Sequence, residues 1–195
     1  MIKEVQNIEE VIDFSWRLSQ NNLYASYPRE KSIEAIKYQI KRAINEDNRN
    51  IISCYNENIL CGICIYFWEV NEKYAQTTQF LIADNFNQTA KEIIDYISKQ
   101  LCGYELLIGI PLSNKNANQY FINNNIECIE SSIVTSLYNL KQHYSKNYDC
   151  IYKIHRKNFD KYAVFHDKHA IPLGMYYNSR NLKKDIDHFK ILVFK

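Results

Sequence analysis

Two pairs of residues have the spacing of metal-binding or redox motifs. Cys61-Gly62-Ile63-Cys64 is a C-x-x-C sequence, and His166 and His169 are separated by about one helical turn. The two cysteines stand in an apolar run with strand character, where residues three apart point to opposite faces. No second cysteine pair has ligand spacing, and the histidines lack a clear third ligand. The sequence therefore predicts two buried thiols, surface or packing histidines, and no metal site.

The composition excludes several other classes of protein. Hydrophobic residues make up 46% of the 195 residues, charged residues make up 24%, and the net charge is only +2. This balance predicts one folded domain, or one plus part of another, without a nucleic-acid footprint. No apolar run approaches the roughly 18 residues of a membrane span. We expect a soluble cytoplasmic protein whose six cysteines are mostly reduced, buried thiols and which binds neither nucleic acid nor a membrane.

Hydrophobic periodicity and turn residues predict the elements of the first 140 residues. Alternation of apolar residues indicates strands, and apolar residues three and four apart indicate helices. The predicted order is β-α-α-β-β-β-α-β-α-β. Strands are expected at 2–6, 50–55, 59–70, 74–83, 106–110 and 127–139, and helices at 8–22, 32–47, 87–101 and 114–124.

A second set of elements follows a polar linker at 141–149. From Cys150 onward the pattern predicts a strand, two helices and a strand that meets the end of the chain. The strands are expected at 151–154 and 189–194, and the helices at 158–169 and 178–188. The last strand, Phe-Lys-Ile-Leu-Val-Phe, is apolar along its length and needs a partner at its edge. Because a strand edge is self-complementary under two-fold symmetry, a homodimer is one expected outcome.

The stretch Ser113 to Asn139 resembles the last quarter of a GNAT-superfamily N-acetyltransferase. It follows the short apolar strand at 106–110 directly and contains an asparagine, one short helix, a tight turn and a long alternating strand. The positions that carry the resemblance are Asn114, Ala117, Tyr120, Phe121, Asn125 and Ile126. The resemblance implies an α/β fold in which helices flank both faces of a mixed, mostly antiparallel sheet. We assign a GNAT-like domain to 1–140, and residues 150–195 resemble the β-α-α-β opening of a second, partial GNAT-like unit.

The resemblance also implies where acetyl-coenzyme A (acetyl-CoA) binds. In the family the cofactor lies between two strands that splay apart, here 74–83 and 106–110, and its pyrophosphate sits at the start of the next helix. A helix N-terminus suits an anion because its N–H groups are unpaired. The loop 83–91 has no glycine and carries Asp84, so an asparagine-capped surface helix that binds nothing is the alternative. The expected cofactor-binding residues are Leu81, Ile82, Ala83, Asn87, Gln88, Thr89, Ala90, Asn114 and Ala117.

The resemblance implies a tyrosine on the short helix that protonates the departing thiolate. This chain has Phe121 at that position, so the expected catalytic residue is the adjacent Tyr120, which lies about 100° further round the helix. A water molecule could replace it, in which case Tyr120 is a packing residue. Glu69, Glu72, Glu105 or a water are the candidate general bases.

Two functions from different classes follow from these residues. The first is an N-acetyltransferase that moves an acetyl group from acetyl-CoA to an amine of a small molecule or peptide. The second is a non-catalytic GNAT-fold binding or interaction module that has lost the pyrophosphate loop and the general acid. Binding of acetyl-CoA distinguishes them.

Overall fold

The computed structural model describes residues 1–132, 150–171 and 177–194. The chain divides into two compact units, Met1–Ser131 and Ser132–Lys195, and each is described by itself. The predicted boundaries near 140 and 150 fall in or beside residues outside the described ranges, and they stay a prediction.

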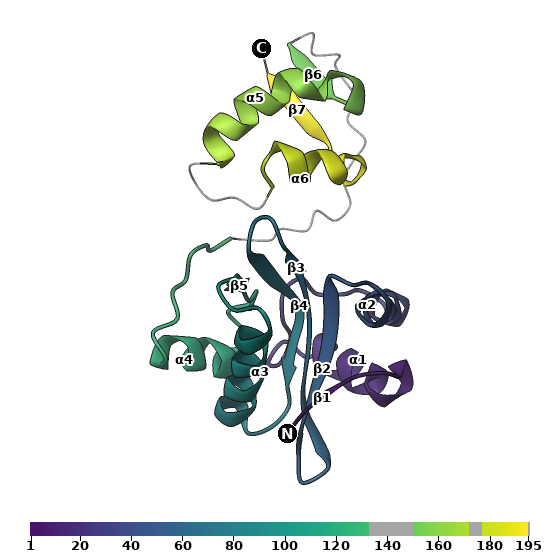
Figure 1. The fold of residues 1–195 in the computed structure, drawn as a ribbon, viewed down its shortest axis with the longest axis vertical. Helices are drawn as coiled ribbons and strands as arrows, with labels where there is room; N and C mark the ends of the chain where they lie inside the picture. The colour runs from purple at the N-terminus through teal and green to yellow at the C-terminus, as the bar shows by residue number, and fades with distance from the viewer. Residues whose placement is uncertain (133–149, 172–176, 195) are drawn as a thin grey trace, which may run out of the picture. The chain divides into compact units, whose positions relative to one another are not determined.

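A five-stranded mixed sheet forms the centre of the first unit (Figure 1). Neighbouring strands from β1 to β4 are antiparallel, whereas β5 runs parallel to β4. The predicted fold class is confirmed. In the order of the sheet, the strands are β1 (Ile2–Glu4), β2 (Arg49–Asn56), β3 (Ile59–Glu69), β4 (Tyr74–Ile82) and β5 (Glu105–Leu107).

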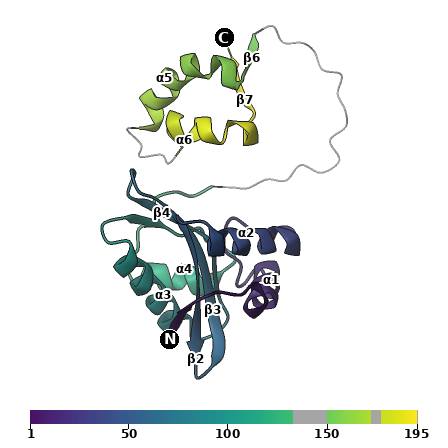
Figure 2. The ribbon, with the colours of Figure 1, turned by 45° about the vertical axis from the view of Figure 1, so that its right-hand side comes forward.

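Helices cover both faces of this sheet, as two views of the ribbon agree (Figures 1 and 2). The helices α1 (Ile12–Gln20) and α2 (Ile33–Asn45) lie on one face, and α3 (Phe86–Gln100) and α4 (Lys115–Asn123) on the other. A short 3₁₀ turn, Ile8–Glu10, precedes α1. Because strand side chains alternate between faces, β4 contributes Leu81 to the core under α1 and α2, and Phe80 to the core under α3 and α4.

Local sequence signals explain where several elements begin and how closely they pack. The Ser32 hydroxyl accepts the N–H of Ala35 and caps α2. Gly62 in β3 allows the first turn of α3 to approach, since a Cβ there would lie 2.7 Å from the Cγ2 atom of Thr89. On the same strand Cys61 and Cys64 are buried free thiols, as predicted, whereas Cys102 and Cys128 are exposed and do not fit the expectation of buried cysteines.

Two predicted strands differ from the structure. The strand predicted at 106–110 is shorter, because from Ile108 the chain leaves β4 and Gly109 pairs with Tyr27 instead. Residues 127–132 of the strand predicted at 127–139 are exposed and belong to no strand, and its remainder lies outside the described residues. No described helix combines the length and the apolar character needed to cross a membrane.

The second unit contains a two-stranded antiparallel sheet and two helices around a small core of Phe159, Leu182 and Ile186. The predicted helix at 178–188 ends at Lys184 and continues as a 3₁₀ turn. The assignment of residues 150–195 as a partial second GNAT-like unit stays a prediction. The elements are β6 (Ile151–Ile154), a 3₁₀ turn (Arg156–Asn158), α5 (Phe159–Ala170), α6 (Ser179–Lys184), a second 3₁₀ turn (Ile186–His188) and β7 (Ile191–Phe194).

The two histidines of α5 are held by their neighbours. His166 Nδ1 lies 3.2 Å from the Tyr162 hydroxyl, and Nε2 lies 2.6 Å from the Tyr177 carbonyl oxygen. The His169 ring packs on the ring of Phe165 with centroids 5.1 Å apart. His166 is half-buried and His169 is exposed, which agrees with the surface or packing role predicted for them. Among the described residues, no group of three or more His, Cys, Asp or Glu side chains could hold a metal ion.

Candidate functional site

The strands β4 and β5 are paired for only three residues and then separate. Tyr74, Ala75 and Gln76 face Glu105, Leu106 and Leu107, and beyond them β4 continues to Ile82 paired with β3 but not with β5. The register between β3 and β4 shifts at Thr78, which is the irregularity expected of a β-bulge. A bulge bends its strand and increases its twist. The result is a split sheet, as the GNAT resemblance implies, with one edge of β4 free of β5.

Backbone groups of β4 face this split. The Phe80 N–H points away from β3, because it donates to the Ser26 hydroxyl oxygen at 3.1 Å in a buried position. Ile82, two residues further, directs its backbone to the same edge by the two-residue repeat of a strand. Leu81 is paired with Ile63 of β3, and the Ala83 N–H donates to the Cys61 carbonyl at 2.8 Å. Of the three predicted pantetheine contacts, the free backbone groups therefore belong to Ile82.

The start of α3 lies directly after β4. The capping residue Asn85 has a positive φ of 48°, and the N–H of Thr89 makes a 3.0 Å bond to the Asn85 carbonyl. Thr89 and Ala90 are buried against the sheet, whereas the side chains of Asn87 and Gln88 are exposed. The N–H groups at positions 86 to 88 precede the helical ladder and leave a partial positive charge there. The four predicted pyrophosphate residues thus divide into two that pack and two that face solvent.

The start of α4 is anchored by Asn114. Its Oδ1 atom accepts the Ala117 N–H at 3.2 Å, and its Nδ2 atom donates to the Ala25 carbonyl at 3.1 Å. Both Asn114 and Ala117 are buried, at 1% and 0% exposure. These two predicted cofactor residues therefore fix the position of α4 relative to the loop after α1. Asn125 beyond α4 has a φ of 53°, so it adopts the left-handed turn predicted for it.

Four aromatic rings close the space between β4, α3 and α4. Each ring packs on two others, with centroids 5.6 to 6.4 Å apart. We call this group, which consists of Phe80, Phe86, Tyr120 and Phe121, the aromatic cluster. Packing of this kind stabilises the fold by about 0.5–1.5 kcal/mol per pair beyond the burial of area. It also occupies space beside the split.

Tyr120 and Phe121 point to different parts of this cluster. The ring of Phe121 packs on Phe80 of β4, whereas the ring of Tyr120 packs on Phe86 at the start of α3. Burial raises the pKa of Tyr120; the negative charge of Asp95 raises it further, and Lys91 opposes both effects. Tyr120 therefore keeps its proton at neutral pH, as a general acid must. The position nearest β4 belongs to Phe121, which has no proton to donate.

The three predicted carboxylates do not lie at the split. Glu69 ends β3, Glu72 is in the turn, and Glu105 begins β5 opposite Tyr74, so all three are at the paired end of the strands. From Tyr74 to Phe80 is roughly 20 Å along a strand at about 3.3 Å per residue. Direct proton transfer needs heavy atoms within about 3 Å. A water molecule therefore remains the simplest general base.

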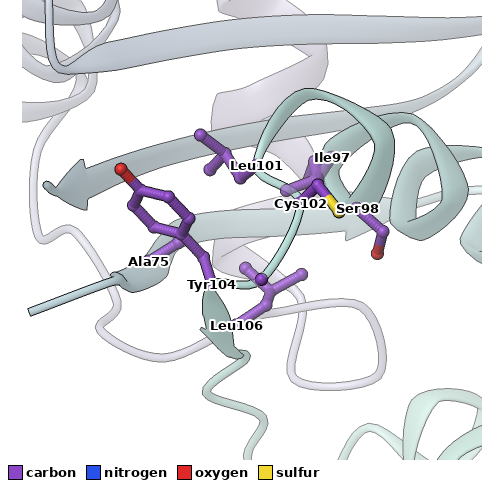
Figure 3. A pocket seen from close by; sticks show the side chains of 8 residues that line it. Ala75, Ile97, Ser98, Leu101, Cys102, Tyr104 and Leu106 are labelled. Atoms are coloured by element: carbon purple, nitrogen blue, oxygen red, sulfur yellow. The ribbon is translucent and has the colours of Figure 1, made fainter.

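Two hollows are present elsewhere on the first unit. One of about 100 Å³ lies between the end of α3 and β5 (Figure 3). A second of about 240 Å³ lies beside the end of α2, next to Glu46 and Arg49. None of the predicted cofactor residues lines either of them. Figure 3 shows the side chains of the first hollow, which is lined by Ala75, Ile97, Ser98, Leu101, Cys102, Gly103, Tyr104 and Leu106.

Two buried polar residues of the first unit, Ser26 and Gln79, have no motif in the sequence. Ser26 lies in the irregular loop after α1, and only its contact with Phe80 identifies it. Gln79 is 2% exposed, and neither polar atom of its amide has a hydrogen-bond partner among the described residues. A buried polar side chain normally finds one. Neither residue could have been recognised from spacing alone.

Comparisons with known proteins give partial structural overlaps at low identity. No protein-family model matches the chain, and no curated protein matches it. Among solved structures, the aminoglycoside 6'-N-acetyltransferase from Enterococcus faecium is 15% identical with a TM-score of 0.39, over 52% of this chain and 53% of its own. This chain thus spans about half the length of that enzyme.

Two further structures overlap with a larger share of the chain. The aminoglycoside antibiotic 6'-N-acetyltransferase AAC(6')-Ih from Acinetobacter baumannii is 10% identical with a TM-score of 0.49, over 71% of this chain and 97% of its own. A transcriptional regulator from Bacillus halodurans C-125 is 11% identical with a TM-score of 0.48, over 70% and 99%. The element order, the split between β4 and β5 and the helices on both faces give the unit Met1–Ser131 a GNAT-like fold.

Proposed function

We propose that the first unit is an N-acetyltransferase that moves an acetyl group from acetyl-CoA to an amine of a small molecule or peptide. The observation that carries this proposal is the split beside β4, with the Phe80 N–H directed into it. A backbone N–H at that place can hydrogen-bond the thioester carbonyl as negative charge develops on its oxygen. The start of α3 lies next along the chain and suits the pyrophosphate.

The proposed reaction assigns a role to each part of this site. The amine nitrogen attacks the thioester carbonyl carbon, a C–N bond forms, and the C–S bond breaks. The departing thiolate takes a proton from Tyr120 or from water, and water accepts the proton that the amine loses. The backbone of Ile82 aligns the pantetheine arm, with Leu81 and Ala83 fixed on β3 beside it, and the N–H groups at 86–88 hold the pyrophosphate on the helix turn that Thr89 and Ala90 anchor to the sheet.

A charge placed at the start of α3 tests this proposal. Asn87 is exposed, and an acid in the first turn of a helix does not destabilise it. Asn87→Asp should therefore leave the melting temperature unchanged or raised while it weakens acetyl-CoA binding on the order of tenfold, because a unit charge near a phosphate costs about 1–3 kcal/mol. Calorimetry with acetyl-CoA measures the affinity.

The matched control places the same charge at the far end of the helix. Gln100→Glu is also exposed, and it should leave the affinity for acetyl-CoA unaltered. Wild-type protein at one hundred times the Kd should be stabilised by about 2.7 kcal/mol. If millimolar acetyl-CoA neither releases heat nor raises the melting temperature, the proposal is rejected.

A non-catalytic binding or interaction module is the second candidate function. The observation that favours it is the aromatic cluster, in which Phe121 replaces a tyrosine and four rings occupy space beside the split. In this case the first unit keeps the GNAT-like fold but does not transfer an acetyl group. Binding of acetyl-CoA without turnover of any amine would favour a module over an enzyme.

A further inference from the structure

The loop after α1 reaches into the split between β4 and β5. Four hydrogen bonds attach it there, and they join it to β4, to the continuation of β5 and to the start of α4. They are Phe80 N–H to Ser26 Oγ at 3.1 Å, Tyr27 N–H to Gly109 O at 2.8 Å, Asn114 Nδ2 to Ala25 O at 3.1 Å, and Ser113 Oγ to Asn22 O at 2.9 Å. We call residues 25–27 the strap.

The strap fits closely between the two strands. A Cβ atom on Gly109 would lie 2.4 Å from the Tyr27 carbonyl oxygen, so only glycine permits this approach. Ala25 and Ser26 are buried at 1% and 4% exposure, whereas Tyr27 is 48% exposed. Small side chains therefore enter the split and a large one stays outside.

The Ser26 hydroxyl takes the place that the proposed function gives to a ligand oxygen. An N–H at a strand edge pairs with an oxygen in its plane, and Ser26 provides that oxygen to Phe80 in the closed structure. A thioester carbonyl cannot accept the same N–H at the same time. The strap and acetyl-CoA are therefore mutually exclusive at this atom.

We propose that the strap is an internal competitor of acetyl-CoA, which closes the split in the free protein and must leave before the cofactor binds. This inference rests on the proposed function and names its regulation. The apparent affinity for acetyl-CoA is proportional to the fraction of molecules whose strap is open, so a mostly closed strap weakens binding. Any change that weakens the strap should therefore strengthen binding.

The variant Ser26→Ala removes the oxygen that holds Phe80 and leaves the small side chain. One neutral hydrogen bond shifts the opening equilibrium roughly two- to tenfold, so the Kd for acetyl-CoA should fall by that factor in calorimetry. Ser53→Ala is the matched control. Ser53 lies in β2, away from the split, and its buried hydroxyl donates to the Lys3 carbonyl of β1 at 3.2 Å. Removal of this hydroxyl should leave the Kd for acetyl-CoA unchanged.

Hydrogen exchange of wild-type protein provides a second measurement that does not depend on how a variant folds. Acetyl-CoA should speed exchange of the Tyr27 amide, which loses the Gly109 carbonyl. The Phe80 amide should stay protected, because its acceptor changes from Ser26 to the ligand. Acetyl-CoA should therefore speed exchange at the Tyr27 amide and leave exchange at the Phe80 amide slow.

The outcomes separate this inference from the proposed function. Tighter binding of acetyl-CoA by Ser26→Ala than by wild type supports the strap. Equal affinity of wild type, Ser26→Ala and Ser53→Ala, with the Tyr27 amide still protected in the complex, overturns the strap and leaves the enzyme proposal intact. Absence of binding to all three proteins rejects the proposed function, and the strap as a competitor with it.

Discussion

Phe121 stands on α4 where the GNAT resemblance places a tyrosine, and its ring packs on Phe80 of β4. A hydroxyl added at this position would lie on the β4 side of the aromatic cluster, nearer the split than the hydroxyl of Tyr120. We therefore expect this one hydroxyl to determine whether the fold transfers an acetyl group at an appreciable rate. A substitution that keeps the ring and adds the hydroxyl tests this expectation.

Phe121→Tyr should raise the rate of acetyl transfer over a panel of amines by up to about 10²-fold, since a positioned general acid contributes roughly 10²–10⁴-fold. Its free energy of unfolding should change by less than about 1 kcal/mol, because Phe121 is only half-buried and packing is retained. Steady-state kinetics and urea denaturation are the measurements. Phe121→Leu is the control without a hydroxyl. A variant that binds acetyl-CoA and shows no faster transfer would count against Phe121 as the missing acid.

At the scale of elements, the contact of α3 with β3 depends on Gly62. The first turn of α3 lies so close to the strand that a methyl group at position 62 would meet the Cγ2 atom of Thr89 at 2.7 Å and the Cδ1 atom of Ile93 at 3.3 Å. The close packing holds the helix N-terminus directly beside the end of β4. The pyrophosphate site proposed at the start of α3 therefore depends on Gly62, which is not among the residues proposed to bind it.

Gly62→Ala should destabilise the protein by about 1–3 kcal/mol, the usual cost of an extra methyl in a packed core. Thr89→Ser removes the opposing methyl but keeps the hydroxyl, which bonds the Asp84 carbonyl at 3.1 Å. The double variant should therefore recover most of the lost stability, beyond the sum of the two single changes. Urea denaturation of the four proteins gives this coupling. Additive losses would show that the helix avoids the clash by shifting as a unit.

At the scale of the whole molecule, the second unit presents an apolar face of its small sheet. Ile151 faces Phe194 and Lys153 faces Leu192 in the register of β6 and β7, so these side chains share one side. Leu192 and Phe194 are 63% and 77% exposed. Apolar residues of a short sheet are a common contact between copies of a chain. The homodimer expected from the sequence, through the edge of the last strand, stays a prediction, and we expect this exposed face of the same strand to contribute to it.

Leu192→Glu combined with Phe194→Glu should convert such a dimer to a monomer in analytical ultracentrifugation. The melting temperature of the first unit should not change, since neither side chain belongs to its cores. Lys190→Glu, which alters charge just before β7, is the control and should leave the dimer intact. A wild-type protein that sediments as a monomer at high concentration would exclude the dimer without reference to the variants.

Local sequence determined most of the elements of this protein. The caps at Ser32 and Asn114 and the left-handed turn at Asn125 depend on interactions within a few residues, so their side chains predict them directly. Apolar periodicity likewise indicated the sheet and its helices, because each element must bury one face. The resemblance at 113–139 added the order of the sheet and the position of the candidate site.

Only the tertiary structure decided how that site is occupied. Ser26 and Phe80 are separated by 54 positions, and Ala25 and Asn114 by 89, so no local pattern encodes their contact. The early end of β5 has the same cause, since Gly109 pairs with the strap in place of β4. Hydrogen bonds between distant segments depend on the packing of all the elements between them. For that reason the sequence could indicate the split between the strands, but not that a loop of the same chain fills it.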